Sequence, residues 1–390
     1  MNEKKSGLFD YIKWRGDLTF SQVEFNEIDA LILSELSYLK MKGIISSQLA
    51  KDGISLTEAA NKFFNSPDVI ERSDMGLFLN DNLIELLKKT ANSKRFGSAK
   101  LSGFVESTDL VKEKQFAAFT AMLEDRSLFI SFRGTDDSLI GWKEDFNMAF
   151  TTPVPSQKEA LHYLEQVALL PGKIRLGGHS KGGNLAVYSA TFCNKKLKRR
   201  ILGVYSNDGP GFEFDITKRP EFAEISDKIH TFVPQTSIVG VLLEHEEDHI
   251  VVKSHETGLM QHDPFSWQLD GPKFLVLDSL SNQGLIIDKT IKEWLKSMNS
   301  LQREQFVDAL FEVITSSEAT TVSELSEKWI HNPVSALKSL LALDEGTRRV
   351  VWNALQQLFR TAKTNIPALS GLFFKGRDES PETKELPKEV

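Results

Sequence analysis

Five residues in the middle of the chain, Gly178-His179-Ser180-Lys181-Gly182, have the types and spacing that present a serine hydroxyl for nucleophilic attack. The apolar run before them and the helical pattern after them predict a strand, a sharp turn and a helix, with Ser180 at the turn. So tight a turn crowds the backbone two residues away on either side, and the two glycines remove the side chains that would clash. The helix that starts after Ser180 would point the backbone N–H of Lys181 at an oxyanion formed during attack.

The acid and the base that a catalytic serine needs must come from elsewhere in the chain. Asp208 follows a predicted strand, residues 201–206, in the turn Asn207-Asp208-Gly209-Pro210-Gly211. Ligand chemistry in open α/β sheets lies at the carboxyl ends of the strands. We therefore predict that Asp208 is the acid, although an ordinary Asp-Gly turn has the same sequence.

The base must be chosen among eight histidines. Four are set aside because they precede the serine, stand beside it, lie inside a strand or lie in the C-terminal helices: His162, His179, His230 and His331. The remaining candidates are His245, His249, His255 and His262. We favour His262, because it lies in a loop rich in turn residues after a predicted strand, and His255 is the alternative.

A second oxyanion donor is predicted where Phe132-Arg133-Gly134-Thr135 ends a strand. A loop at that place can aim another backbone N–H at the oxyanion, and Thr135 is the natural donor. A simple strand-ending turn would have the same sequence.

The pattern of apolar residues predicts the elements that hold these groups. Between residues 20 and 95 the apolar residues recur at three- and four-residue steps, which indicates helices that would cover a sheet. The sheet is expected to start at Gln115, where two apolar runs around Glu124-Asp125 predict a β-hairpin. Further strands are expected at residues 174–177, 201–206, 229–233, 249–253 and 274–277. Strands that alternate with helices predict an α/β fold with a mostly parallel central sheet and an antiparallel hairpin at one edge.

Beyond about residue 286 the strand pattern disappears. Amphipathic helices are predicted there, over residues 287–298, 302–314, 322–329 and 334–358. We therefore divide the chain into a main domain at 1–285 with a helical N-terminal segment, a helical bundle at 286–372, and a disordered tail at 373–390 that is rich in Glu, Lys, Pro and Ser.

Composition excludes several classes of protein. The net charge of −7 and the pI near 5.7 argue against a nucleic-acid partner. The single cysteine, Cys193, excludes an internal disulfide, and the N-terminal residues lack the apolar region of a secretory signal, so a cytoplasmic location is expected. No apolar run approaches the roughly 18 residues that span a bilayer. A soluble protein is expected, and peripheral contact with a membrane stays open.

The same segments resemble known enzymes. Phe132-Arg133-Gly134-Thr135, Trp142 with Asp145-Phe146, and Gly178 to Ala186 together resemble the class 3 lipases, in detail over residues 115–195 and loosely to 270. The first 280 residues, from Tyr11-Ile12-Lys13-Trp14-Arg15-Gly16-Asp17 to Gln261-His262-Asp263-Pro264-Phe265-Ser266-Trp267, resemble a family of uncharacterised bacterial lipase-like proteins.

The lipase resemblance implies an α/β-hydrolase fold, with Ser180 as the nucleophile, the Thr135 region in the oxyanion hole and Asp145 in a supporting role. The position of the acid differs from that in class 3 lipases. Class 3 lipases carry their acid after a later strand, where residues 231–237 of this chain contain no carboxylate. The turn Asp208-Gly209-Pro210-Gly211 is instead similar to the acid-bearing turn of pancreatic-type lipases.

Two alternatives stay open. His245-Glu246-Glu247-Asp248-His249 fits the HExxH pattern of zinc peptidases, but that motif requires a helix through both histidines and a β run follows His249 immediately. A hydrolase fold could also be retained as a catalytically inactive binding module, with the C-terminal helices as the surface for a protein partner.

The sequence therefore predicts a serine hydrolase that cleaves a carboxylic ester, a lipid or acyl ester, through Ser180, His262 and Asp208. Lys181 and Thr135 would form the oxyanion hole, and Gly178 and Gly182 would shape the elbow. No cofactor and no metal are expected.

Overall fold

The computed structural model describes residues 6–74, 82–240, 242–243, 248–315, 319–325 and 344–365. Its α-helices are α1 (Leu8–Arg15), α2 (Glu27–Glu35), α3 (Leu56–Phe64), α4 (Val69–Ser73), α5 (Asn82–Ala91), α6 (Leu139–Asn147), α7 (Pro155–Val167), α8 (Lys181–Phe192), α9 (Lys195–Lys198), α10 (Pro220–Ala223), α11 (Asn282–Lys296), α12 (Ser300–Thr315) and α15 (Glu345–Asn365). Short 3₁₀ helices are η1 (Leu36–Tyr38), η2 (Ile216–Lys218), η3 (Ser226–Lys228), η4 (Gly258–His262) and η5 (Pro264–Ser266).

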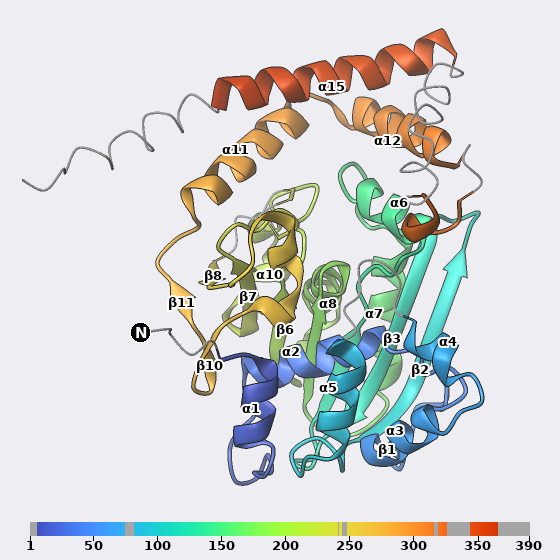
Figure 1. Ribbon diagram of the computed structural model, residues 1–390, viewed down its shortest axis with the longest axis vertical. Helices are drawn as coiled ribbons and strands as arrows, with labels where there is room; N and C mark the ends of the chain where they lie inside the picture. The colour runs from blue at the N-terminus through green and yellow to red at the C-terminus, as the bar shows by residue number, and fades with distance from the viewer. Residues whose placement is uncertain are drawn as a thin grey trace, which may run out of the picture.

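The strands are β1 (Ile54–Ser55), β2 (Lys100–Asp109), β3 (Lys114–Met122), β4 (Leu128–Phe132), β5 (Ile174–His179), β6 (Ile201–Asn207), β7 (Ile229–Pro234), β8 (His249–Val252), β9 (Leu269–Asp270), β10 (Lys273–Phe274) and β11 (Val276–Leu277). They form a nine-stranded sheet in the order β1-β2-β3-β4-β5-β6-β7-β8-β11 and a separate pair, β9 with β10. Neighbours from β4 to β8 are parallel, and both flanks are antiparallel. Figure 1 shows the sheet between helices on its two faces.

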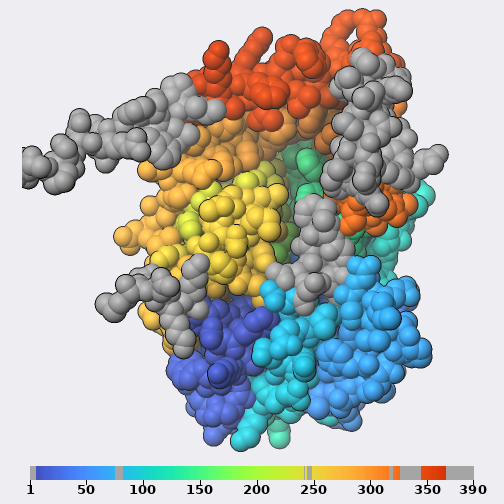
Figure 2. Space-filling model, viewed as in Figure 1, coloured from blue at the N-terminus to red at the C-terminus, as the bar shows by residue number. Residues whose placement is uncertain are grey.

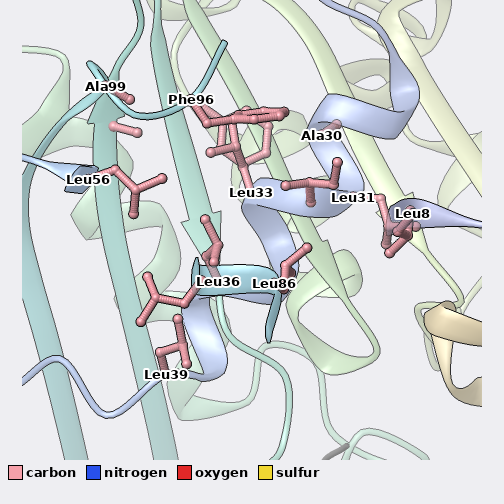
Figure 3. Packing of buried hydrophobic residues seen from close by; sticks show 14 of the residues in the cluster. Leu8, Ala30, Leu31, Leu33, Leu36, Leu39, Leu56, Leu86, Phe96 and Ala99 are labelled. Atoms are coloured by element: carbon pink, nitrogen blue, oxygen red, sulfur yellow. The ribbon is translucent and has the colours of Figure 1, made fainter. Parts of the chain in front are cut away.

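Helices cover both faces of the central strands, so these strands are apolar on both sides. On one face, Ile130 of β4 and Leu176 of β5 share a buried cluster with Leu164 of α7 and Leu185 of α8. On the other face, Phe129 of β4 joins a cluster built largely from the N-terminal helices, part of which is drawn in Figure 3. Burying one leucine completely stabilises the fold by roughly 1.5–3 kcal/mol, so these two clusters fix the layers.

Helix α2 lies against β4, β5 and β6 and is buried along nearly its whole length. Its sequence, Glu-Ile-Asp-Ala-Leu-Ile-Leu-Ser-Glu, is apolar on several sides, as expected of a helix enclosed by other elements. Asn26 starts the helix by accepting hydrogen bonds from the N–H groups of Ile28 and Asp29. Near the other end, a β-carbon placed on Gly177 would lie 3.1 Å from Ser34 Oγ, so α2 passes close to the strand that precedes Ser180.

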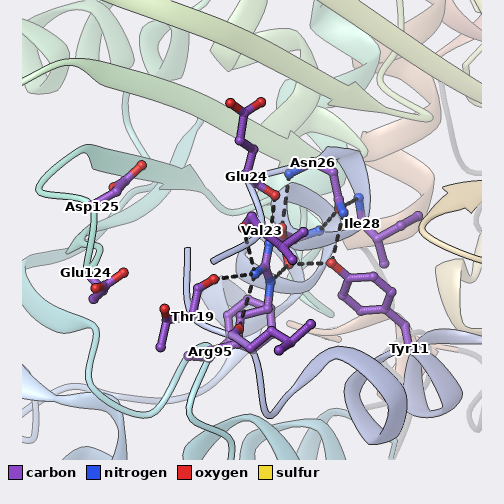
Figure 4. Close-up of polar contacts among 12 residues, drawn as sticks. Tyr11, Thr19, Val23, Glu24, Asn26, Ile28, Arg95, Glu124 and Asp125 are labelled. Atoms are coloured by element: carbon purple, nitrogen blue, oxygen red, sulfur yellow. Dashed lines mark hydrogen bonds and ion pairs between the residues drawn. The ribbon is translucent and has the colours of Figure 1, made fainter. Parts of the chain in front are cut away.

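A buried ion pair anchors the start of α2. The Arg95 guanidinium donates to both carboxylate oxygens of Asp29, at 2.7 and 2.5 Å, and also to the carbonyl oxygens of Val23 and Glu24 (Figure 4). Tyr11 donates its hydroxyl to the same carboxylate at 2.9 Å. Because every charged group here has partners, the network fixes the entry of the chain into α2.

Among the C-terminal helices, α15 packs on α11 and on α12, and α12 packs on α6 (Figures 1 and 2). Trp142 of α6 and Phe150 contact the buried cluster that includes Phe306 of α12. Lys143 of α6 forms an ion pair with Asp308 at 3.1 Å. Helix α12 thus contacts the helix that follows the Thr135 loop, whereas the helices predicted at 322–329 and 334–358 lie partly outside the described residues. The domain division at 285 stays a prediction, and the tail at 373–390 lies outside the residues that the structure describes.

Two expectations about the sheet are wrong. The sheet does not start at Gln115, because β1 and β2 precede that residue, and it is antiparallel at both edges rather than at one. The pairing of β2 with β3 shifts register between Ser102 and Val105, where Gly103 has a φ of +66°. That irregularity breaks the two-residue alternation that identifies a strand in a sequence.

In the part of the chain that the structure covers, no helix is both long and apolar enough to cross a membrane.

Candidate active site

Ser180 occupies the sharp turn that the sequence predicts. Strand β5 ends at His179 and α8 begins at Lys181, so a single residue joins them. Ser180 has φ +57° and ψ −134°, a conformation that side-chain-bearing residues rarely adopt. Its N–H donates to the carbonyl oxygen of Asn207 at 2.9 Å, and its own carbonyl accepts from Gly183 N at 2.9 Å. The neighbouring strand and the new helix therefore hold the strained residue in place.

The two glycines of the elbow face surrounding backbone. A β-carbon on Gly178 would lie 2.2 Å from the carbonyl carbon of Gly182, and one on Gly182 would lie 2.2 Å from the carbonyl oxygen of Phe132. Neither clash can be relieved by a side-chain movement, because the opposing atoms belong to the backbone. The turn can thus form only with glycine at both positions.

Asp208 and His262 lie together. Nδ1 of His262 is 2.6 Å from Oδ2 of Asp208, which is fully buried at the end of β6. The other carboxylate oxygen, Oδ1, accepts hydrogen bonds from Ser237 Oγ at 2.5 Å and from Gly240 N at 3.1 Å. With Nδ1–H donated to the carboxylate, Nε2 of His262 carries a lone pair that can accept a proton.

The His262 imidazole lies against the elbow. Its ring centroid is 4.5 Å from that of His179, the residue before Ser180, and Nε2 of His179 is 2.9 Å from the carbonyl oxygen of His262. The side chain of His255, the alternative, instead has its Nε2 3.7 Å from a carboxylate oxygen of its neighbour Glu256. The structure therefore brings His262, the favoured histidine, to Asp208 and next to the serine turn.

The Thr135 loop also reaches the elbow. A β-carbon built on Gly134 would lie 3.1 Å from Cβ of Ser180 and 2.6 Å from the carbonyl oxygen of His179. The Thr135 hydroxyl donates to Oδ2 of Asp145 at 2.5 Å, and Oδ1 of that carboxylate is 3.5 Å from Nζ of Lys181. One carboxylate thus links the side chains of the two residues whose N–H groups are the candidate oxyanion donors.

The side chain of Lys181, the residue after Ser180, is completely buried. Nζ donates to Gln115 Oε1 at 2.8 Å and to Glu144 Oε2 at 3.2 Å. Glu144 also accepts from the N–H of Gln115 at 2.9 Å. Burial raises the pKa of Asp145, and the Lys181 ammonium opposes that rise. These partners compensate the buried charge and fix the start of α8.

Three further residues near the site were not among the sequence candidates: Glu35, Tyr38 and Ser237. Glu35 is a charged residue in an otherwise apolar run, which is the kind of signal that could have identified it. Ser237 belongs to the segment 231–237 that lacks a carboxylate, and its hydroxyl supports Asp208. His179, set aside in the sequence, contacts His262 directly.

The structure does not place the end of the HExxH motif on a helix. His249 begins strand β8, so a helix does not run through the end of the motif. His245 and Glu246 lie outside the described residues.

One cavity in the described part of the chain lies away from this site. It has a volume of about 460 Å³ and is lined by residues of α7, β2 and β3, with Leu49, Phe116 and Tyr163 among them. No candidate of the serine site lines it.

Comparisons with known proteins place the chain in a family. Among solved structures, the M37 lipase has a TM-score of 0.33 and 15% identity, covering 56% of this chain and 69% of that chain. The Rhizomucor miehei lipase, in complex with its propeptide, has a TM-score of 0.31 and 15% identity, covering 61% and 76%. No curated protein matches significantly. The profile of one family matches residues 90–312, more than half of the chain, and the chain belongs to this family, the Mbeg1-like family.

Proposed function

We propose that this protein is a serine hydrolase that cleaves a carboxylic ester, on a lipid or another acyl compound. The observation that carries the proposal is the 2.6 Å contact between Nδ1 of His262 and Asp208, made where the His262 ring packs against the residue before Ser180. Asp208 and His262 come from separate segments of the chain and contact each other, and Ser180 directly follows the residue on which His262 packs. Membership of a lipase-like family supports the same reaction class.

The proposed reaction needs protein groups and water only. Ser180 Oγ attacks the ester carbonyl carbon, while its proton passes to Nε2 of His262. Asp208 holds the imidazole and stabilises its positive charge, and the N–H groups of Lys181 and Thr135 stabilise the oxyanion. The tetrahedral intermediate expels the alcohol, which takes the proton from His262. Water then attacks the acyl-enzyme carbon and gives a proton to His262. His262 returns that proton to Ser180 Oγ as the bond to the acyl group breaks and the acid leaves.

The proposed substrate is an ester with an apolar acyl chain. The short helix η4, which carries His262, also exposes Leu259 and Met260, at 51% and 62% of their surface. Apolar side chains in water beside a proposed base favour a substrate with an apolar chain over a small polar ester.

A fluorophosphonate probe on the full-length protein tests the proposal, because only an activated serine reacts with it efficiently. Labelling of the wild type at Ser180, and none in Ser180→Ala or His262→Ala, is the expected result. Ser226→Ala, in the exposed η3 segment, is the matched control and should label like the wild type. Turnover of p-nitrophenyl esters of graded length then identifies the acyl chain. A correctly folded wild type that does not label would instead favour the inactive binding module.

A further inference from the structure

His179 contacts the loop of the proposed base on one side of its ring. Its Nε2 lies 2.9 Å from the backbone carbonyl oxygen of His262. A carbonyl can only accept a hydrogen bond, so Nε2 carries the hydrogen and Nδ1 of the neutral ring carries the lone pair. The two imidazole rings pack at a centroid distance of 4.5 Å. The residue before the proposed nucleophile therefore holds the residue proposed as the base through both a hydrogen bond and ring packing.

The end of α2 encloses the other side of the ring. Oε1 of Glu35 lies 3.3 Å from Nδ1 of His179, and the Tyr38 hydroxyl lies 3.3 Å from both that nitrogen and the His179 carbonyl oxygen. The Glu35 contact is close but lacks the angles of a hydrogen bond, since Oε1 has no hydrogen-bond partner. All three side chains are buried, so the ring cannot turn away from the His262 loop without displacing a packed neighbour.

Burial keeps the imidazole of His179 uncharged. Burial, followed by the nearby His262, holds the pKa of His179 well below its ordinary value. Burial, followed by the carboxylate of Asp263, raises the pKa of Glu35 well above its ordinary value. A neutral His179 matters to the proposed reaction, because His262 becomes positively charged when it takes the serine proton and a second cation at this distance would oppose that step.

We propose that His179 is a positioning residue: its Nε2–H fixes the loop that carries His262, and Glu35 and Tyr38 fix His179 from the other side. The inference rests on the proposed serine hydrolase function for its kinetic consequence. In this proposal the serine turn positions two residues, Ser180 itself and, through His179, His262.

Two substitutions separate the hydrogen bond from the ring. In His179→Gln the amide N–H can reach the His262 carbonyl but the ring is lost, whereas in His179→Phe the ring stays and the N–H is lost. We expect kcat of His179→Gln to stay within about threefold of the wild type, and kcat of His179→Phe to fall at least about tenfold at nearly constant KM, since misplacing a catalytic group by a fraction of an ångström is costly. Ser226→Ala, in the exposed η3 segment, is the control and should keep the kcat of the wild type. If His179→Phe does not fold, His179→Leu replaces it.

A second readout does not depend on turnover. In histidine-labelled protein, the Nδ1 proton of His262 that is bonded to Asp208 gives a downfield NMR signal, which should persist in His179→Gln and broaden or vanish in His179→Phe. Wild-type kcat and an unchanged signal in His179→Phe would overturn the inference, as would equal losses in both variants with equal drops in Tm. If the wild type neither labels with fluorophosphonate nor cleaves esters, the proposed function fails, and the NMR comparison alone still decides whether His179 positions His262.

Discussion

Asp208 receives the His262 imidazole with one carboxylate oxygen while two other groups, Ser237 Oγ and Gly240 N, occupy the other oxygen. Asp208→Asn would keep this shape but place an amide opposite Nδ1, which favours the wrong tautomer of the base. In the proposed mechanism kcat should fall by about three to four orders of magnitude. Steady-state hydrolysis of the best p-nitrophenyl ester measures the loss.

The matched control is Asp270→Asn, an exposed aspartate in strand β9. It should leave kcat unchanged. An Asp208→Asn enzyme that folds normally and loses less than about tenfold would remove Asp208 from the proposed triad.

The Thr135 hydroxyl and the Asp145 carboxylate are 2.5 Å apart, and this bond fixes the loop whose N–H is the proposed oxyanion donor. Thr135→Val keeps the shape and removes the bond, so the N–H should be less well aimed. We expect kcat to fall by about tenfold to a hundredfold with a small change in KM, because the oxyanion is absent from the bound substrate and develops in the transition state. Thr135→Ser should restore most of the rate. Equal kcat in the valine and serine variants would contradict the assignment.

The regular parts of the fold could be predicted because their residues follow simple periods. Strands β5, β6, β7 and β8 all lie where short apolar runs predict them. The strand predicted at 274–277 is divided instead, because Leu275 separates β10 from β11 and the two belong to different sheets. Strand β2 was missed because a bulge at Gly103 hides its alternation. Which strand pairs with which depends on contacts that a local pattern does not contain.

The site was predictable to the extent that its residues lie at strand ends. Ser180 and Asp208 directly follow β5 and β6, and the structure puts both in left-handed backbone conformations. The role of Glu35 could not be predicted, because it reaches the site from a helix more than a hundred residues away from Ser180 in the sequence. Burial of the Lys181 side chain could not be predicted either, because its partner Glu144 reaches it only in the folded chain.

The Arg95–Asp29 pair gives a prediction about stability. Both side chains are completely buried, so Arg95→Met would leave the Asp29 carboxylate buried without its cation. We expect the free energy of unfolding to fall by about 3–5 kcal/mol, measured by urea denaturation near neutral pH. Arg349→Ala, which breaks an exposed pair with Glu345, should change it very little. A loss no larger than that of the control would mean that the network does not anchor α2.

Glu35 and His179 give a prediction about pH, because the fold keeps both side chains neutral. The pKa of Glu35 is raised from 4.5, so the native state holds a proton that the unfolded state has lost, and this contribution to stability falls as pH rises above 4.5. The pKa of His179 is lowered from 6.5, so the unfolded state binds a proton that the native state does not, and this contribution rises as pH rises toward 6.5. Between pH 4.5 and 6.5 the two contributions to the stability of the wild type therefore change with pH in opposite directions.

Replacing either residue should leave only the other residue's contribution to the change of unfolding free energy with pH. Relative to the wild type, Glu35→Gln should become more stable as pH rises through the window between 4.5 and 6.5, and His179→Gln should become less stable. Each slope is at most about 1.4 kcal/mol per pH unit, since each variant changes the balance by one proton. Tyr38, Asp263 and His262, the other titratable groups that face the pair, are unchanged in both variants, so their terms largely cancel in the comparison. Urea denaturation at several pH values measures the slopes, and two slopes of the same sign would show that the fold does not keep both groups neutral.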